Sequence, residues 1–159
     1  MSFPAPARTY LFKALAGTPD VLAKLLAGIE ATDPIWDKRP DLERFSLREV
    51  LAHLADWEPI WKSRFERMRD EENPFLGSVD EGQLVIDHDY AHQDPIANLA
   101  RYKQGRRELV DVLGALSDED WDKTGYREFV GDLTVQMLAS LIQSHDGYHL
   151  VQVVKWLEA

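Results

Sequence analysis

The sequence predicts an all-α fold, a bundle of four main helices. Apolar residues recur at steps of three and four along most of the chain, whereas no long alternating run of Val, Ile and Thr indicates a half-buried strand. The chain has 159 residues, which suits one domain with a single hydrophobic core. No internal repeat or low-complexity tract divides it. We therefore expect one domain over residues 1–159, with residues 1–6 as a loose N-terminal tail.

The first helix is expected from about Ala7 to Ile29. Thr18 and Pro19 interrupt it, because the threonine can cap a helix and the proline suits a first turn, so we expect a kink or a restart there. A polar connection that contains proline follows, over residues 31–45. The apolar face of this helix is formed by Leu11, Leu15, Leu22, Leu25, Leu26 and Ile29.

The second helix has the clearest start signal in the chain. Ser46 and Glu49 form a capping box, in which the hydroxyl and the carboxylate each satisfy a backbone N–H group at the start of a helix. Pro59 should bend this helix, because its ring removes the hydrogen bond to the carbonyl group of Ala55. The apolar stripe behind the capping box consists of Leu47, Val50, Leu51, Leu54, Trp57, Trp61, Phe65 and Met68.

Two further helices complete the predicted bundle. Residues 71–93 are polar and show little periodicity, so they predict a long crossover connection between helices 2 and 3, of the kind that parallel neighbours need. Asp94 and Pro95 then supply a cap and a first-turn proline for the third helix. The fourth helix is expected to start at Thr134. Its apolar stripe consists of Leu138, Leu141, Ile142, Val153 and Trp156.

Two histidines lie within this last stripe. His145 and His149 follow the same steps of three and four as the apolar residues around them, so both should face the bundle interior. At a spacing of four residues their Cβ atoms are about 6 Å apart, a separation from which two imidazoles can converge on one metal ion. A third imidazole, His53, lies at the edge of the apolar stripe of the second helix.

These three histidines suggest a site for one divalent metal. They would leave open positions for water or a substrate, as catalytic metal sites do. Zinc, nickel and ferrous iron all accept such ligands. The alternative is that each histidine is a hydrogen-bonded core residue without a ligand. That alternative requires a partner for each buried imidazole, because an unpaired buried polar group costs about 1–3 kcal/mol.

Several other polar residues have two interpretations each. His88 and His92 form a second pair four residues apart, but they lie in the polar connection, where we expect solvated or locally hydrogen-bonded side chains. Arg106 interrupts the apolar stripe of the third helix. It either anchors a substrate carboxylate or a thiol cofactor near the metal, or forms a salt bridge with an acidic neighbour such as Asp56 or Glu58.

Trp57 and Asp146 complete the set of candidate residues. Trp57 fills the core by its spacing and could also line the mouth of a substrate cavity. Asp146 could orient an imidazole or face solvent, and we expect solvent.

Composition excludes several classes of function. The chain has 18 Lys and Arg against 28 Asp and Glu, a net charge of −10, which disfavours nucleic acid as a partner. It has no Cys, so disulfides, thiolate nucleophiles and Cys-based metal sites are impossible. No signal peptide and no apolar run of about 18 residues is present, so we expect a cytoplasmic protein that does not bind membranes.

Residues 46–58 (SLREVLAHLADWE) and 144–150 (SHDGYHL) together resemble the DinB/YfiT-like superfamily of metalloenzymes. The resemblance implies a four-helix bundle of up-down-down-up topology with one metal held by His53, His145 and His149. Characterised relatives include thiol-dependent S-transferases and isomerases, so a low-molecular-weight thiol is a second cofactor that the resemblance allows. It also implies a homodimer.

Two functional hypotheses follow from these observations. The first is a metal-dependent enzyme, of thiol S-transferase or hydrolase type, that acts on a small-molecule substrate. The second is a non-catalytic helical bundle that binds a ligand or serves a stress response without turnover. A metal whose coordination positions are all filled by protein groups would favour the second hypothesis.

Overall fold

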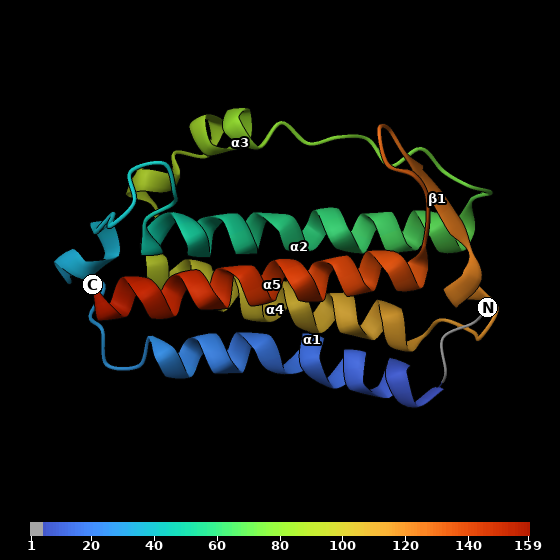
Figure 1. The fold of residues 1–159 in the computed structure, drawn as a ribbon, viewed down its shortest axis with the longest axis horizontal. Helices are drawn as coiled ribbons and strands as arrows, with labels where there is room; N and C mark the ends of the chain where they lie inside the picture. Colours follow the sequence, from blue (N-terminus) through green and yellow to red (C-terminus); the bar gives the residue numbers. More distant parts are fainter. Residues whose placement is uncertain (1–4) are drawn as a thin grey trace.

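Four long helices lie side by side in the computed structural model, which describes residues 5–159 (Figure 1). They are α1 (Ala5–Leu25), α2 (Leu47–Asp70), α4 (Pro95–Gly114) and α5 (Val135–Glu158). The predicted four-helix bundle is thereby confirmed. In Figure 1, α2 and α4 run in one direction, and α1 and α5 run in the opposite direction. Of the tail predicted over residues 1–6, residues 1–4 lie outside the described part, and Ala5 already belongs to α1.

The starts of three helices follow the local sequence signals. The Ser46 hydroxyl accepts a hydrogen bond from the backbone N–H of Glu49, and the Glu49 carboxylate accepts one from the backbone N–H of Ser46. The predicted capping box is therefore confirmed, and it starts α2. Asp94 caps α4 and Thr134 caps α5, each through a side-chain oxygen. Short polar side chains thus fix where these helices begin.

Helix α1 is one continuous helix, so the restart expected at Pro19 does not occur. Thr18 does not cap a new helix, because its hydroxyl donates to the carbonyl of Ala14 one turn back. Pro19 has no N–H to offer the carbonyl of Leu15. That carbonyl instead accepts a hydrogen bond of 3.0 Å from the guanidinium of Arg106 on α4. The proline therefore leaves an acceptor free, and a buried arginine uses it to join α1 to α4.

The connection from α2 to α4 runs back along α2, as expected of a crossover (Figure 1). It contains a short helix, α3 (Glu81–Asp87), and a 3-10 turn, η2 (Tyr90–His92), which the weak periodicity of this segment did not indicate. Two further 3-10 turns lie in the other connections, η1 (Pro34–Asp37) and η3 (Asp120–Asp122).

A β-hairpin, which the sequence analysis missed, precedes α5. Strand β1 (Thr124–Arg127) pairs antiparallel with β2 (Gly131–Thr134), so that Thr124 faces Thr134 and Arg127 faces Gly131. The start of the crossover connection lies beside this hairpin, and the N–H of Leu76 donates to the carbonyl of Tyr126 at 2.7 Å. Strands of four residues are too short to produce a recognisable alternation, which explains the omission.

Buried side chains form two apolar clusters along the bundle. The first includes Leu15, Phe65, Leu109 and Ile142, and the second includes Leu22, Leu51, Tyr102 and Val153. A polar layer lies in the middle of the bundle; its buried members are His53, Glu58, Arg106, Asp146, His149 and Gln152. Among the helices described in residues 5–159, none is both long and apolar enough to cross a membrane.

Helices α2 and α4 approach each other closely at Gly105. A Cβ atom added at this position would lie 2.5 Å from the Cβ atom of Glu58. Gly105→Ala should therefore lower the free energy of unfolding by about 1–3 kcal/mol, because the overlap outweighs the gain of about 1 kcal/mol in helix propensity. Urea unfolding measures the difference.

Gly17 on α1 provides the matched control. It has no neighbouring atom within 4 Å of an added Cβ, so Gly17→Ala should stabilise the protein by up to about 1 kcal/mol. A Gly105→Ala variant as stable as the wild type would show that α2 and α4 are not closely packed at this point.

Candidate metal centre

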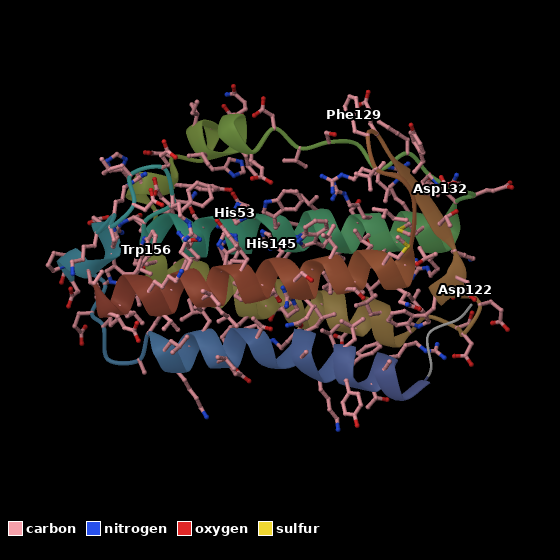
Figure 2. All side chains as sticks on the ribbon, in the orientation of Figure 1. His53, Asp122, Phe129, Asp132, His145 and Trp156 are labelled. Atoms are coloured by element: carbon pink, nitrogen blue, oxygen red, sulfur yellow. The ribbon has the colours of Figure 1, made fainter. Side chains whose placement is uncertain are left out.

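Three histidines from two helices meet inside the bundle. Figure 2 labels two of them, His53 and His145. Helix α2 carries His53, and α5 carries His145 and His149, so that one ligand nitrogen from each lies within 4.8 Å of the others. The Nε2 atoms of His53 and His145 are 2.9 Å apart, and the ring centroids of His145 and His149 are 4.6 Å apart. The predicted convergence of the three side chains is confirmed. Within residues 5–159, no other group of three His, Asp or Glu side chains meets this spacing.

All three imidazoles are held in the neutral form. Burial, together with the neighbouring His149 and His145, lowers the pKa of His53 to about 2. Burial also lowers the pKa of His149 to about 3 and that of His145 below its ordinary value. Neutral imidazole is the form that binds a metal, so these side chains are ready to act as ligands near pH 7.

The surrounding protein does not satisfy every nitrogen of these imidazoles. Nδ1 of His145 is buried without a hydrogen-bond partner. The Nε2 atoms of His53 and His145 face each other, and only one of a neutral pair can donate. A divalent cation would accept both lone pairs, and three neutral nitrogens suit zinc, nickel or ferrous iron. The residues present therefore fit a metal better than they fit a hydrogen-bonded core.

Gln152 orients His149. Its Nε2 donates to the backbone carbonyl of Phe45 at 2.8 Å, which leaves its Oε1 to accept a hydrogen bond from Nδ1 of His149 at 3.2 Å. Nδ1 of His149 therefore carries the proton, and its Nε2 keeps a free lone pair. The sequence analysis missed Gln152, although its position three residues after His149 places it on the same face of α5.

A cavity of about 250 Å³ opens onto the three histidines. Its lining also includes Arg44, Gln152 and Tyr148, with the exposed carboxylates Glu43 and Glu81. This volume lies just below the range of about 300–1,000 Å³ that is usual for small-molecule sites, so it suits a compact substrate group.

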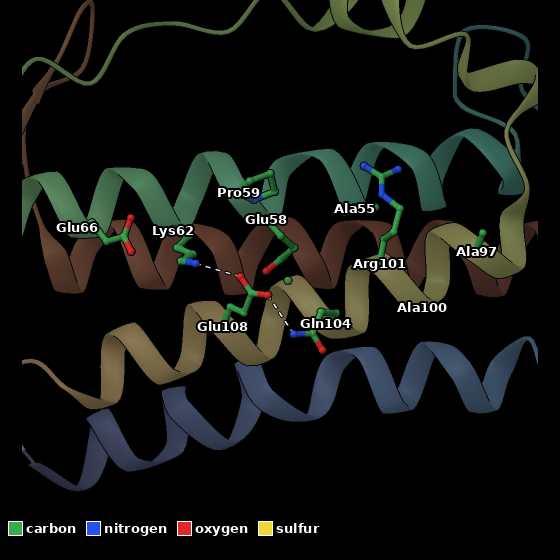
Figure 3. Close-up of a pocket in the computed structure, with 11 residues that line it drawn as sticks. Ala55, Glu58, Pro59, Lys62, Glu66, Ala97, Ala100, Arg101, Gln104 and Glu108 are labelled. Carbon is green, nitrogen blue, oxygen red and sulfur yellow. Dashed lines mark hydrogen bonds and ion pairs between the residues drawn. The ribbon is translucent and has the colours of Figure 1, made fainter.

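A larger hollow, of about 700 Å³, lies between α2 and α4 and is lined by neither histidine nor tryptophan (Figure 3). Lys62 and Glu108 both line it and form an ion pair of 3.0 Å with each other. This hollow is therefore separate from the three-histidine site.

Trp57 lies beside the histidines but is almost fully buried, with 3% of its surface exposed. Its ring stacks on Trp61 with centroids 4.4 Å apart, and its centroid lies 6.1 Å from that of His53. The side chain borders the site and does not line the cavity. Substrate binding by Trp57 stays a prediction.

Arg106 forms buried ion pairs, and this was one of the two interpretations expected for it. Its guanidinium, 2% exposed, hydrogen bonds to Glu58 and to Asp146, both 1% exposed. Burial alone would lower the pKa of Arg106, but the hydrogen bonds to Asp146 and Glu58 raise it above its ordinary value. A role in substrate binding stays a prediction, although protein acceptors already occupy this guanidinium. The expectation that Asp146 faces solvent was wrong, because it pairs with Arg106.

His88 and His92 do not join the metal centre. His88 hydrogen bonds to the buried carboxylate of Asp56 at 2.6 Å, and His92 to the carboxylate of Asp89 at 2.7 Å. The expected local hydrogen bond is found for His92, whereas the partner of His88 lies on another helix, 32 positions earlier in the chain.

The lowered pKa values predict that the metal-free protein loses stability in acid. In the unfolded chain His53 and His149 titrate near pH 6.5, whereas in the folded chain their pKa values are about 2 and about 3. Below pH 6.5 the unfolded state therefore binds more protons, and stability falls as the pH falls. The expected loss for each of the two histidines is about 2 kcal/mol between pH 7 and pH 5, and its slope approaches about 1.4 kcal/mol per pH unit well below pH 6.5. Urea unfolding of the metal-free protein between about pH 7 and pH 5 measures it.

A double variant isolates this effect from the titration of carboxylates. His53→Gln combined with His149→Gln removes both groups and should give a shallower pH dependence than the wild type. His92→Gln, at a side chain that is 81% exposed, is the control and should keep the wild-type slope. Equal slopes in the wild type and the double variant would show that these histidines are not held neutral.

Comparisons with known proteins show which family and which proteins this chain resembles. Residues 14–153 match the DinB superfamily. The chain is 26% identical over 137 residues to the uncharacterized protein YuaE of Bacillus subtilis (strain 168), a match that covers 77% of this chain and 83% of YuaE. The solved structure of YfiT from Bacillus subtilis matches with a TM-score of 0.86 at 23% identity, covering 98% of this chain and 88% of YfiT. YfiT is described as "a probable metal-dependent hydrolase with an unusual four-helix bundle topology", and the likeness shows a shared fold.

Proposed function

The chain belongs to the DinB superfamily, and from this premise we propose that it is a metal-dependent hydrolase of a small-molecule substrate. The observation that carries the proposal is the convergence of three neutral imidazoles, His53, His145 and His149, within 4.8 Å of one another at a cavity. These side chains would hold one divalent cation. The description of YfiT as a metal-dependent hydrolase supports the same reaction class.

The cavity lining favours a nucleophile taken from solvent. No Ser, Thr, Cys or Lys lines it, so the usual side-chain nucleophiles of covalent hydrolysis are missing from the described site. When bound, a divalent cation supplies Lewis acidity and lowers the pKa of water toward 7. The protein's own part is to hold the ligands: Gln152 keeps the proton of His149 on Nδ1. The buried stack of Trp57 and Trp61 excludes bulk water from one side of the site.

A spectroscopic experiment tests whether the centre is open, as hydrolysis requires. We would load the untagged protein with cobalt(II), a visible substitute for zinc, and add azide as a small anionic ligand. A change in the visible spectrum on adding azide is expected, because an open position can exchange its ligand. A cobalt spectrum that does not respond would indicate a centre closed by protein groups, and would favour the non-catalytic module.

Activity assays then separate hydrolysis from thiol transfer. The zinc, nickel and ferrous forms would be assayed on small esters and amides, with and without glutathione as a low-molecular-weight thiol. We expect turnover that requires the metal and no thiol. An absolute thiol requirement would reassign the protein as an S-transferase, and equal turnover after metal removal would contradict metal dependence.

A further inference from the structure

Arg44 lies at the cavity of the three histidines with unused hydrogen-bonding capacity. It lines this cavity together with His53, His145 and His149. No carboxylate of residues 5–159 forms an ion pair with it. Its Nε atom is buried and has no hydrogen-bond partner. An arginine that no carboxylate neutralises, beside a candidate catalytic centre, can take an anionic ligand.

Neighbouring side chains hold this guanidinium in place. It lies over the ring of Tyr148, 4.7 Å from the centroid, and over the ring of Trp156 at 5.0 Å. Its Nη2 donates to Oε1 of Gln152 at 3.2 Å, the same oxygen that accepts from Nδ1 of His149. One amide oxygen therefore ties the position of Arg44 to that of a candidate metal ligand.

The other arginines of this segment are already paired. Arg39 forms an ion pair with Glu49, and Arg48 forms one with Asp37 at 2.7 Å. Arg44 differs because aromatic faces hold it, and no carboxylate of the described residues pairs with its guanidinium.

We propose that Arg44 binds an anionic group of the substrate, a carboxylate or a phosphate, beside the metal centre. The assignment rests on the proposed function and adds a substrate class to it. A guanidinium binds both kinds of oxyanion through two parallel N–H groups. Because the chain has a net charge of −10, its overall field does not attract anions, and recognition must depend on this local cation.

The exposed carboxylates at the same cavity restrict what can bind. Glu43 and Glu81 line it, so a polyanion would meet repulsion at the rim. A compact substrate with a single anionic group avoids this repulsion. The small volume of the cavity, about 250 Å³, points to the same kind of ligand.

The test uses inorganic phosphate and acetate as probes of the two oxyanion classes. Each is titrated into zinc-loaded and into metal-free protein while the ¹H–¹⁵N resonance of Arg44 Nε is followed by NMR, assigned by its absence from Arg44→Lys. We expect this resonance to shift in both forms. The probe that saturates at the lower concentration identifies carboxylate or phosphate as the preferred group.

Two variants and a control make the test decisive. Arg44→Gln and Arg44→Lys lack this resonance, so anion binding to them and to the wild type is compared by calorimetric titration. Each variant should bind the anion at least tenfold more weakly, because a lysine keeps the charge but loses the planar pair of donors. Arg69→Gln removes an exposed arginine that is paired with Asp70, and should not change the affinity. Unchanged binding in both Arg44 variants would overturn the assignment. Circular dichroism confirms that the variants are folded.

The two proposals can fail separately. Failure to bind zinc would refute the metal centre, whereas the titration of metal-free protein would still decide the role of Arg44. Anions that bind only zinc-loaded protein, and bind it equally well in Arg44→Gln, would show that the cation alone attracts them. That result would refute the arginine subsite and leave the metal centre intact.

Discussion

Replacing His149 with alanine should leave a folded bundle that binds a divalent metal more than about 100-fold more weakly. The estimate is a lower bound, because the loss of an outer hydrogen-bond partner of a ligand alone costs about 10–100-fold. His149 is 5% exposed and lies between the other two histidines and Gln152. Its removal leaves two imidazoles, which cannot complete a three-nitrogen site. Competition with a chromophoric chelator measures the affinity, and circular dichroism measures the helical content.

His92→Ala is the matched control for this experiment. It also removes an imidazole from a helical turn, but its side chain is 81% exposed and hydrogen bonds to the exposed Asp89. Metal affinity should therefore stay at the wild-type level. If His149→Ala bound metal as tightly as the wild type, His149 would not be a ligand, and the three-histidine centre would have to be abandoned.

Replacing Arg106 with methionine should cost about 3–5 kcal/mol of stability, the usual loss when one partner of a buried ion pair is removed. The variant leaves the carboxylates of Glu58 and Asp146 buried without their cation. It also leaves the carbonyl of Leu15, which Pro19 cannot satisfy, without its donor. The free energy of unfolding of small proteins is about 5–15 kcal/mol, so this loss would remove a large fraction of it. Urea unfolding at constant pH measures it.

The stability loss in Arg106→Met should depend on pH, in a direction set by the ionisation of Glu58. Burial raises the pKa of Glu58 above its ordinary value, against the opposing effect of Arg106. The ionised carboxylate is thus the costly form, and stability falls as the pH rises through the raised pKa. Without Arg106 that cost increases, so the difference between variant and wild type should shrink as the pH is lowered from about 8 to about 5.

A triple variant separates the loss of the ion pair from the loss of packing. Arg106→Met combined with Glu58→Leu and Asp146→Leu replaces the whole network by apolar groups, a change that is often neutral or stabilising. It should be several kcal/mol more stable than Arg106→Met alone. A single variant within about 1 kcal/mol of the wild type would show that the network contributes little to folding.

The helices could be predicted where their signals are local. The capping box of Ser46 and Glu49, the cap at Asp94 and the cap at Thr134 each depend on residues within one turn of one another, and all three were found. The continuous course of α1 through Pro19 could not be predicted in this way. It involves the pairing of the Leu15 carbonyl with an arginine 91 positions later.

The hairpin at residues 124–134 was missed for a related reason. Its strands are four residues each, and the backbone hydrogen bonds of Tyr126 reach the start of the crossover connection, at Pro74 and Leu76. Such contacts between distant segments leave no periodic signal in the sequence.

The candidate site, too, contains some residues that the sequence could predict and others that it could not. His53, His145 and His149 could be found because the helical period and the apolar stripes place them on inward faces. Gln152 lies on the same face of α5 and was overlooked, whereas Arg44 could not be found in this way, because it reaches the site from a connection that has no period. Asp146 was assigned to solvent because its buried partner lies on another helix. The sequence thus identifies the candidate ligands, and tertiary contacts identify what orients them and what they face.

The most direct test of the metal centre is anomalous diffraction from crystals soaked in zinc, with data measured on both sides of the zinc absorption edge. One strong peak is expected at about 2.0–2.1 Å from Nε2 of His53, His145 and His149. Crystals of His149→Ala should lack that peak. A peak bound only to surface carboxylates, or no peak at all, would contradict the account and leave the three histidines as core residues without a ligand.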